Sequence, residues 1–303
     1  MAIALAILAA LFYLGRNYFT RVQLELLTQA NPIHVAAVAA LFLLTRLLTG
    51  RFLQIALASL GHHISLIEAF LVTMLRVYTG LLVPRAGFGV AGIYLKMRHH
   101  VNLTHYTALV LPLVFLQCCA IGPLGIAGMV FLHYRYDDPI SWPIVGIFVC
   151  ATMVGVAALL FRFRIPVTWS GRIARLATSL ADAWHLLGGN RGLTLRLVGL
   201  HFVMILLRVV RLYLAFQAIG LAPHFVGVLV SSLLADLAFM IGVTPNGLGL
   251  REATIVLSSR VIGVDQSGAL MAALLDRIVT TLIIILVAQA ALWKLGGRSR
   301  EGP

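Results

Sequence analysis

The stretch Val243–Ala253 places a proline, two glycines and an adjacent Arg–Glu pair between two apolar segments. Charged side chains are costly at the centre of a bilayer, so they persist there mostly where function needs them. Backbone that leaves the helix at that depth must be buried in protein or line a wet cavity, because lipid cannot satisfy free N–H and C=O groups. The stretch is therefore a candidate substrate site, centred on Pro245, Gly247, Gly249, Arg251 and Glu252.

Other charged residues inside apolar segments extend this candidate site. Arg208 and Arg211 are one helical turn apart and share a face, so these two like charges need an anionic partner. That partner could be Asp236, Glu252 or a lipid phosphate. Arg277 directly follows an aspartate in the last apolar segment, where membership of the site and structural pairing are both open. We expect a polar site near the membrane midplane that is completed by Arg208, Arg211, Asp236 and Arg277.

Glu252 has two alternative roles. As an acid in the first turn of a helix that begins near Leu248, it would complement the positive helix end, which is a structural role. Free N–H groups at the same helix end could instead hold a phosphate, and Glu252 would then accept from a cationic headgroup or hold an arginine in place. Arg251 and Glu252 could also pair with each other, but neighbours in a helix do not face each other, so we expect different partners. Gly247 and Gly249 would permit the bend and a close approach of the headgroup.

A second interrupted segment carries a similar pattern. Gly87-Phe88-Gly89-Val90 matches Gly247-Leu248-Gly249-Leu250 at an offset of 160 residues, and each run shortly follows a proline. Arg46 is a counterpart of Arg208 at a similar offset. Proline removes a backbone donor and glycine tolerates unusual dihedral angles, so each segment is predicted to form two short helices that meet at a bend. A secondary, pseudo-symmetric site would comprise Arg46, Pro84, Arg85, Gly87 and Gly89.

The composition sets the class of protein around these sites. Hydrophobic residues make up 61% of the 303 residues and charged residues 11%, with a mean hydropathy of +0.99. A soluble domain carries about 25% charged residues, so the chain is predicted to be a membrane protein. The net charge of +13 is nearly all arginine. We assign this charge to cytoplasmic loops and anionic lipid headgroups, and not to nucleic acid, because no basic run is interleaved with exposed aromatic residues.

Six apolar segments are close to or longer than the roughly 20 residues needed to cross a bilayer. They lie at Ala2–Phe19, Ile33–Leu60, Thr104–Leu132, Ser141–Phe161, Leu197–Ile219 and Gly268–Trp293. Two further apolar segments, Ile64–Met97 and Phe225–Ile262, contain the breaks. The predicted fold is an all-α polytopic integral membrane protein, in which one transmembrane domain (1–303) has six full helices and two re-entrant hairpins.

The charges of the connecting segments predict the orientation of these helices. Basic connections follow the first broken segment and the fourth span, and a third basic run marks the C-terminus, which places all three runs and both termini in the cytoplasm. The connection 133–140 balances one arginine with two aspartates and is placed outside. The two halves, approximately 1–135 and 141–295, would then form an inverted repeat, the architecture of many transporters.

The connection between the two halves has an amphipathic sequence pattern. In the loop 163–196, apolar residues recur at helical spacing from Trp169 to Leu187, while arginine, serine and aspartate fall largely on the other side. This pattern is typical of an amphipathic helix. The helix would lie on the cytoplasmic leaflet or pack on the protein's own loops.

The run Pro245–Ala253 resembles the P-G-G-L-G-x-R-E-A signature of the lysylphosphatidylglycerol synthase transmembrane (flippase-like) family. Gly263, Val264 and Arg277 continue the resemblance, which covers nearly the whole chain. It implies a multi-pass protein of the bacterial inner membrane, related to the domain that moves aminoacylated phospholipids across the bilayer. The chain departs from the family's first motif, because no acid follows Gly89 and the next span lacks arginine. The soluble aminoacyl-transferase domain of the bifunctional relatives is not expected here.

The leading functional hypothesis is a transporter, or flippase, for an anionic or phosphate-bearing lipid, aminoacylated and polyprenyl forms included, that uses no catalysis. The alternatives are a membrane enzyme acting on a lipid or polyprenyl phosphate, and an accessory subunit that presents lipid to a partner enzyme. The sequence contains no P-loop, no zinc-binding motif and no βαβ context for a dinucleotide, so no cofactor or metal is predicted. The expected partners are a membrane lipid and a lipid-modifying enzyme, and not nucleic acid.

Overall fold

The computed structural model describes residues 29–83, 86–101, 103–137, 139–160, 191–241 and 244–297. Every regular element in these ranges is a helix, which confirms the predicted all-α class. The predicted first span and the predicted amphipathic helix lie outside the described residues. In chain order the elements are α3 (Pro32–Ala58), α4 (Leu66–Leu82), α5 (Ala86–His99), α6 (Leu103–Tyr136), α7 (Trp142–Leu160), α9 (Arg191–Ala218), α10 (Phe225–Ile241), η2 (Pro245–Gly247), α11 (Leu250–Leu257), α12 (Ser259–Ile262) and α13 (Gln266–Gly297).

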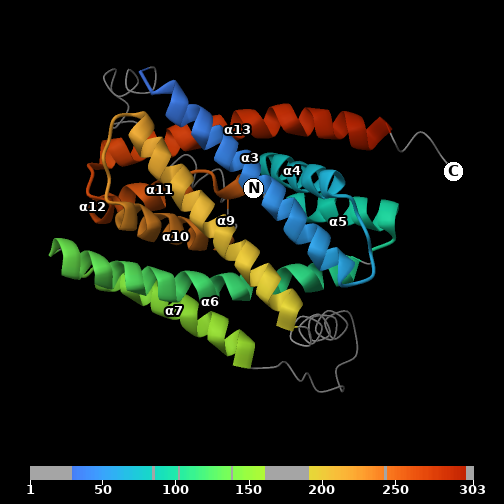
Figure 1. The fold of residues 1–303 in the computed structure, drawn as a ribbon, viewed down its shortest axis with the longest axis horizontal. Coiled ribbons are helices and arrows are strands. Elements are labelled where there is room, and N and C mark those ends of the chain that lie inside the picture. The colour runs from blue at the N-terminus through green and yellow to red at the C-terminus, as the bar shows by residue number, and fades with distance from the viewer. Residues whose placement is uncertain are drawn as a thin grey trace.

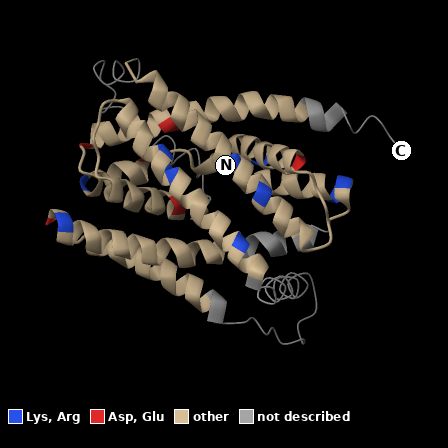
Figure 2. Cartoon of the chain, in the orientation of Figure 1, with Lys and Arg blue, Asp and Glu red and all other residues tan. Residues whose placement is uncertain are grey.

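The helices have the length and composition of a polytopic membrane protein. Four of them, α3, α6, α9 and α13, are long and apolar enough to cross a membrane, and α7 and α10 are apolar but shorter over their described residues. Figure 2 shows how sparsely Lys, Arg, Asp and Glu are distributed along them. Three helices run well past the segments that predicted them, since α6 ends at Tyr136, α9 begins at Arg191 and α13 ends at Gly297. Backbone hydrogen bonding does not need apolar side chains, so a helix can continue beyond them.

Two helix starts follow local sequence rules. The side chain of Asn31 accepts a hydrogen bond from the Ile33 N–H at 3.0 Å, and proline occupies the first turn of α3, where its missing N–H costs nothing. Ser65 accepts from the Glu68 N–H at 3.2 Å at the start of α4, and Glu68 is an acid in that first turn. These residues fix where α3 begins and where the first interrupted segment begins.

Both interrupted segments are helix pairs, as predicted. α5 packs back against α4, and α11 and α12 pack back against α10. Figure 1 shows the first pair toward the right of the view and the second pair toward the left. The element at the break of the second pair, η2, contacts α4 of the first. The two broken segments therefore meet inside the helix assembly.

The long helices frame these pairs. α3 and α9 pack side by side, and they run antiparallel, since the Asn31 N–H at the start of α3 donates to the Ala218 carbonyl at the end of α9 at 2.8 Å. α13 packs on α4, α9 and α11, whereas α6 packs on α7 and α10. The last helix of each predicted half, α6 or α13, thus lies against the first helix of the other half's broken segment, α10 or α4.

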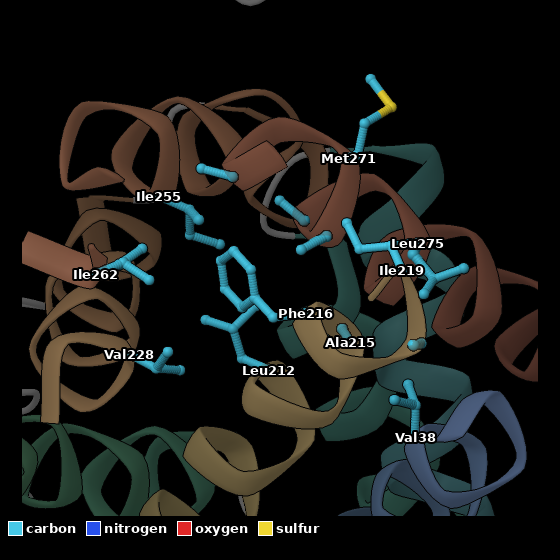
Figure 3. Packing of buried hydrophobic residues seen from close by; sticks show 14 of the residues in the cluster. Val38, Leu212, Ala215, Phe216, Ile219, Val228, Ile255, Ile262, Met271 and Leu275 are labelled. Carbon is cyan, nitrogen blue, oxygen red and sulfur yellow. The ribbon is translucent and has the colours of Figure 1, made fainter. Parts of the chain in front are cut away.

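A buried apolar cluster joins α3, α9, α13 and the second broken pair. Figure 3 shows Phe216 of α9 between Leu212 of the same helix, Ile255 of α11 and Ile262 of α12. Phe216 and Ile255 are fully buried. Large side chains removed from solvent on several sides hold the short helices α11 and α12, which could not be stable alone. This cluster positions the charged residues described next.

Candidate functional site

The second break is built from backbone that only a few residue types adopt. Asn246, Gly247 and Gly249 have φ of +46°, +69° and +78°, which are left-handed conformations. Glycine reaches these angles without steric cost and asparagine more readily than other side chains, so the predicted role of the two glycines in the bend is confirmed. Helix α11 then begins at Leu250, two residues beyond the predicted start.

Charged side chains hold this loop from two directions. The Glu252 carboxylate accepts a hydrogen bond from the Gly249 N–H at 2.7 Å, so it caps α11 as a first-turn acid. Arg277 of α13 donates through both terminal nitrogens to the Asn246 carbonyl at 3.2 Å, and its Nε lies 3.8 Å from Glu252 Oε1. The loop is therefore fixed both to its own helix and to α13.

Asp276 is the centre of the charge network. Its side chain is fully buried and lies between two arginines from different helices. The Arg251 Nη1 of α11 donates to Oδ2 at 2.7 Å. The Arg211 Nε of α9 lies 2.7 Å from Oδ1 without the alignment of a hydrogen bond, while Arg211 Nη2 donates to Oδ2 at 3.3 Å. Arg251 and Glu252 thus have different partners, as predicted, and one aspartate connects α9, α11 and α13.

A second ion pair is looser. Arg208 Nη2 of α9 lies 3.3 Å from Asp236 Oδ2 of α10, and the two side chains keep 24% and 12% of their surface exposed. Neither Arg208 Nε nor Asp236 Oδ2 has a hydrogen-bond partner. The structure therefore brings Arg208 to Asp236 and Arg211 to Asp276, and the two like-charged neighbours on α9 have separate acids.

Arg46 of α3 joins the network without an acid of its own. Its guanidinium lies 5.0 Å from the centroid of the Phe42 ring, and that of Arg211 lies 5.5 Å from the same centroid. The buried Arg46 Nε has no hydrogen-bond partner, and no carboxylate among the described residues lies within ion-pair distance of Arg46. The contact that stabilises this cation among the described residues is the aromatic face of Phe42.

Arg76 of α4 is a member that the sequence reasoning missed. Its guanidinium lies 3.7 Å from the centroid of the Phe88 ring of α5, and its side chain hydrogen-bonds to Tyr106 of α6. Like Arg46, it has no carboxylate partner in the described part of the chain. The signal available in the sequence was its place as the only charged residue of the apolar run 69–84.

The first break differs from the expectation of a glycine bend. Pro84 and Arg85 lie outside the described residues, and Gly87 and Gly89 fall within α5 rather than at the bend. Gly87 is needed for close packing, because a Cβ there would collide with the Arg76 carbonyl oxygen of α4. A Cβ on Gly89 would meet open space. Of the three described residues of the predicted secondary site, Arg46 joins the charge network and Gly87 and Gly89 do not.

Together these side chains form one network with an excess of positive charge. Six arginines face three carboxylates, which is an excess of three positive charges, because Asp276 is shared by two arginines and Arg46 and Arg76 have no acid among the described residues. The arginines are Arg46, Arg76, Arg208, Arg211, Arg251 and Arg277, and the acids are Asp236, Glu252 and Asp276. Arginine presents a planar fork of donors that suits phosphate and carboxylate oxygens. The network can therefore hold an anion. Among the described residues, no group of three or more His, Cys, Asp or Glu is placed to hold a metal ion.

Comparison with known proteins assigns the chain to a family. The family described as "Lysylphosphatidylglycerol synthase TM region" matches residues 1–288, which is most of the chain and includes every residue of the charge network. No curated protein and no solved structure matches. The chain belongs to the lysylphosphatidylglycerol synthase transmembrane-region family.

Proposed function

We propose that this protein is a lipid transporter that moves an anionic or phosphate-bearing lipid across the bacterial inner membrane. The observation that carries the proposal is the arginine excess of the charge network, in which six arginines face three carboxylates and two of the arginines, Arg46 and Arg76, have no acid within ion-pair distance among the described residues. Unbalanced charges inside a membrane protein are expensive unless a ligand completes them. A lipid phosphate would supply the missing negative charge.

The arrangement of the helices supports a transport role. Broken helices that meet inside the membrane, contributed by two halves of a chain, are typical of transporters that bind substrate at their meeting point. Here α13 of the second half packs on α4, and α6 of the first half packs on α10. This reciprocal packing fits the predicted inverted repeat of residues 1–135 and 141–295. A lipid headgroup needs a polar path through the bilayer, and the arginines of α3, α4 and α9 would line it.

A reconstitution assay tests the proposal. The purified protein would be placed in phosphatidylcholine vesicles with a trace of phosphate-bearing lipid labelled in one leaflet, and movement of the label would be followed together with its chemical identity. We expect movement without chemical change, and a loss of at least about tenfold for Arg208→Gln, since a charge-assisted contact is removed. Arg260→Gln serves as the matched control, because Arg260 is exposed on α12 and lies outside the network.

The outcomes separate the three functional classes. Formation of a new lipid species would favour the membrane enzyme acting on a lipid phosphate. The purified protein could also show neither movement nor product by itself. If adding a lipid-modifying enzyme then restored movement, the accessory-subunit role would be favoured. Movement that is unchanged in Arg208→Gln would remove the charge network from the transport path.

A further inference from the structure

The carboxylates of the charge network are all occupied by arginine. Asp276 is shared by Arg211 and Arg251, Asp236 lies against Arg208, and Glu252 is held between the Gly249 N–H and Arg277 (Glu252 being 8% exposed). An aminoacylated headgroup brings at least one ammonium group, which is a donor only and needs an acid or a carbonyl to accept from it. Binding such a headgroup would require one of these acids to leave its arginine. Each of the three carboxylates thus already lies within ion-pair distance of an arginine, and an ammonium group would have to compete with that arginine for it.

Four arginine Nε atoms of the network are buried without hydrogen-bond partners, and so are three carboxylate oxygens, but each of these oxygens lies within ion-pair distance of an arginine. Arg46 Nε and Arg208 Nε are buried without hydrogen-bond partners, and Arg46 and Arg76 have no acid in the described part of the chain. A phosphate monoester has about two negative charges at neutral pH and three strong acceptor oxygens. Arginine forks bind such oxygens in pairs, so one phosphate could be shared between two of these side chains.

The described residues of the first broken pair, α4 and α5, contribute no carboxylate to the charge network. The acidic residue of α4, Glu68, lies in its first turn, where it accepts from the Tyr94 hydroxyl at 2.7 Å and contacts His99 Nε2 at 2.8 Å. Gly89 is followed by valine, so no acid stands directly after this glycine. Among the described residues of α4 and α5, Arg76 is the one that contributes charge to the network.

A second positively charged region lies where α3 ends and α9 begins. A cavity of about 610 Å³ is lined there by Arg51 and Arg196, both exposed, together with His63, Gln54 and Ser59. Arg51 donates to the Gln54 side chain, and Gln54 in turn donates to the Ile64 carbonyl at 2.8 Å, which orders this wall of the cavity. None of the described residues that line the cavity is acidic. Helices α3 and α9 also carry Arg46 and Arg208 further inside.

We infer that the substrate of this transporter is a lipid whose headgroup is a phosphate monoester, and that lipids with an ammonium-bearing, aminoacylated headgroup are excluded. The inference rests on the proposed function and narrows its substrate class. The acids of the site organise the arginines, and the arginines without acids, Arg46 and Arg76 above all, bind the phosphate. The apolar tail of the lipid is not selected by these contacts.

Thermal unfolding of the purified protein with three lipids tests the inference independently of transport. Phosphatidic acid, phosphatidylglycerol and lysylphosphatidylglycerol would each be added in matched amounts to the protein in neutral detergent, with inorganic phosphate as a fourth sample. We expect phosphatidic acid to raise Tm most and lysylphosphatidylglycerol least, and Arg46→Gln to remove this order while Arg260→Gln keeps it. In vesicles, phosphatidic acid should move at least about tenfold faster than lysylphosphatidylglycerol, as for the loss of a charge-assisted contact.

Each of the other outcomes contradicts one part of the inference or the transport proposal. Equal or greater stabilisation by lysylphosphatidylglycerol would contradict the exclusion of ammonium headgroups. A shift with inorganic phosphate as large as that with phosphatidic acid would show a site for free phosphate and contradict a lipid substrate. If no lipid moves in vesicles while the expected order of Tm shifts holds, the transport proposal fails and the headgroup preference stands. If lysylphosphatidylglycerol moves fastest, transport stands and the headgroup preference fails.

Discussion

The two broken segments carry the same glycine pattern and use it differently. In the second, Gly247 and Gly249 adopt left-handed angles, and Glu252, Arg277 and Asp276 fix the loop to α11 and α13. In the first, Gly87 and Gly89 are ordinary helical residues of α5, and Gly87 allows α5 to approach the backbone of α4. One glycine pattern thus serves conformation at one site and packing at the other. The balanced charges lie around the second break, and an unbalanced one, Arg76, lies beside the first.

Removing the central acid should have the largest effect on stability. Asp276→Asn leaves Arg211 and Arg251 without their shared carboxylate in a fully buried position. Loss of one partner of a buried ion pair costs roughly 3–5 kcal/mol, so we expect the free energy of unfolding to fall by about that amount. Chemical denaturation in detergent measures it. Asp236→Asn, at the looser and partly exposed pair, is the comparison and should cost clearly less; equal costs would contradict the central place of Asp276.

Glu252→Gln should have a smaller effect. The amide oxygen of glutamine can still accept from the Gly249 N–H, and Arg277 keeps its contacts with the Asn246 carbonyl. The charge that faces Arg277 at 3.8 Å is lost, so we expect a decrease of about 1–3 kcal/mol in the free energy of unfolding. The same denaturation experiment applies. Unchanged stability combined with lost transport would instead give Glu252 a direct role toward the headgroup.

A matched pair of alanine substitutions separates the two glycine roles. Gly249→Ala places a side chain at φ +78° and should destabilise by about 1–2 kcal/mol. Gly89→Ala lies in a helix with open space around its Cβ and should stabilise by about 0.5–1 kcal/mol, because alanine is the better helix former. Thermal unfolding of both variants gives the signs. Destabilisation by Gly89→Ala would mean that the first break also needs a glycine conformation.

Substitutions at the ends of the two helix pairs opposite the breaks should have the smallest effect on stability. Glu68 joins Tyr94 and His99 across the open end of the first pair, while the second is joined there by the His224 N–H and the Ile262 carbonyl. Because the Glu68 and His99 side chains are partly exposed, Glu68→Gln should cost no more than about 1 kcal/mol. Hydrogen exchange of α5 amides measures local opening of this end. A loss as large as that of Asp276→Asn would show that the first pair depends on charge as strongly as the second.

The sequence alone predicted the helical class and both broken segments, because apolar length and the proline and glycine positions are local signals. It also singled out most of the charged residues that the structure brings together, whose role as a substrate site stays a prediction. It also predicted separate partners for Arg251 and Glu252, since neighbours on a helix diverge. It could not predict that Asp276 lies between α9 and α11, because that depends on how three helices pack. Arg76 was missed for a similar reason: only the packing of α4 against α5 and α6 brings it to Phe88 and Tyr106. The glycines of the first break were assigned to a bend because their pattern matches the second, yet their environment differs.

The central claim is that Arg46, which has no acid among the described residues, binds the phosphate of the lipid. The thermal stability of Arg46→Gln tests this claim most directly. In lipid-free detergent, removing a buried cation that lies near like charges and has no acid should leave Tm unchanged or raise it, while the Tm increase caused by phosphatidic acid should disappear. A fall of Tm in lipid-free detergent, with the phosphatidic acid shift retained, would show that Arg46 is a structural residue and would contradict the claim.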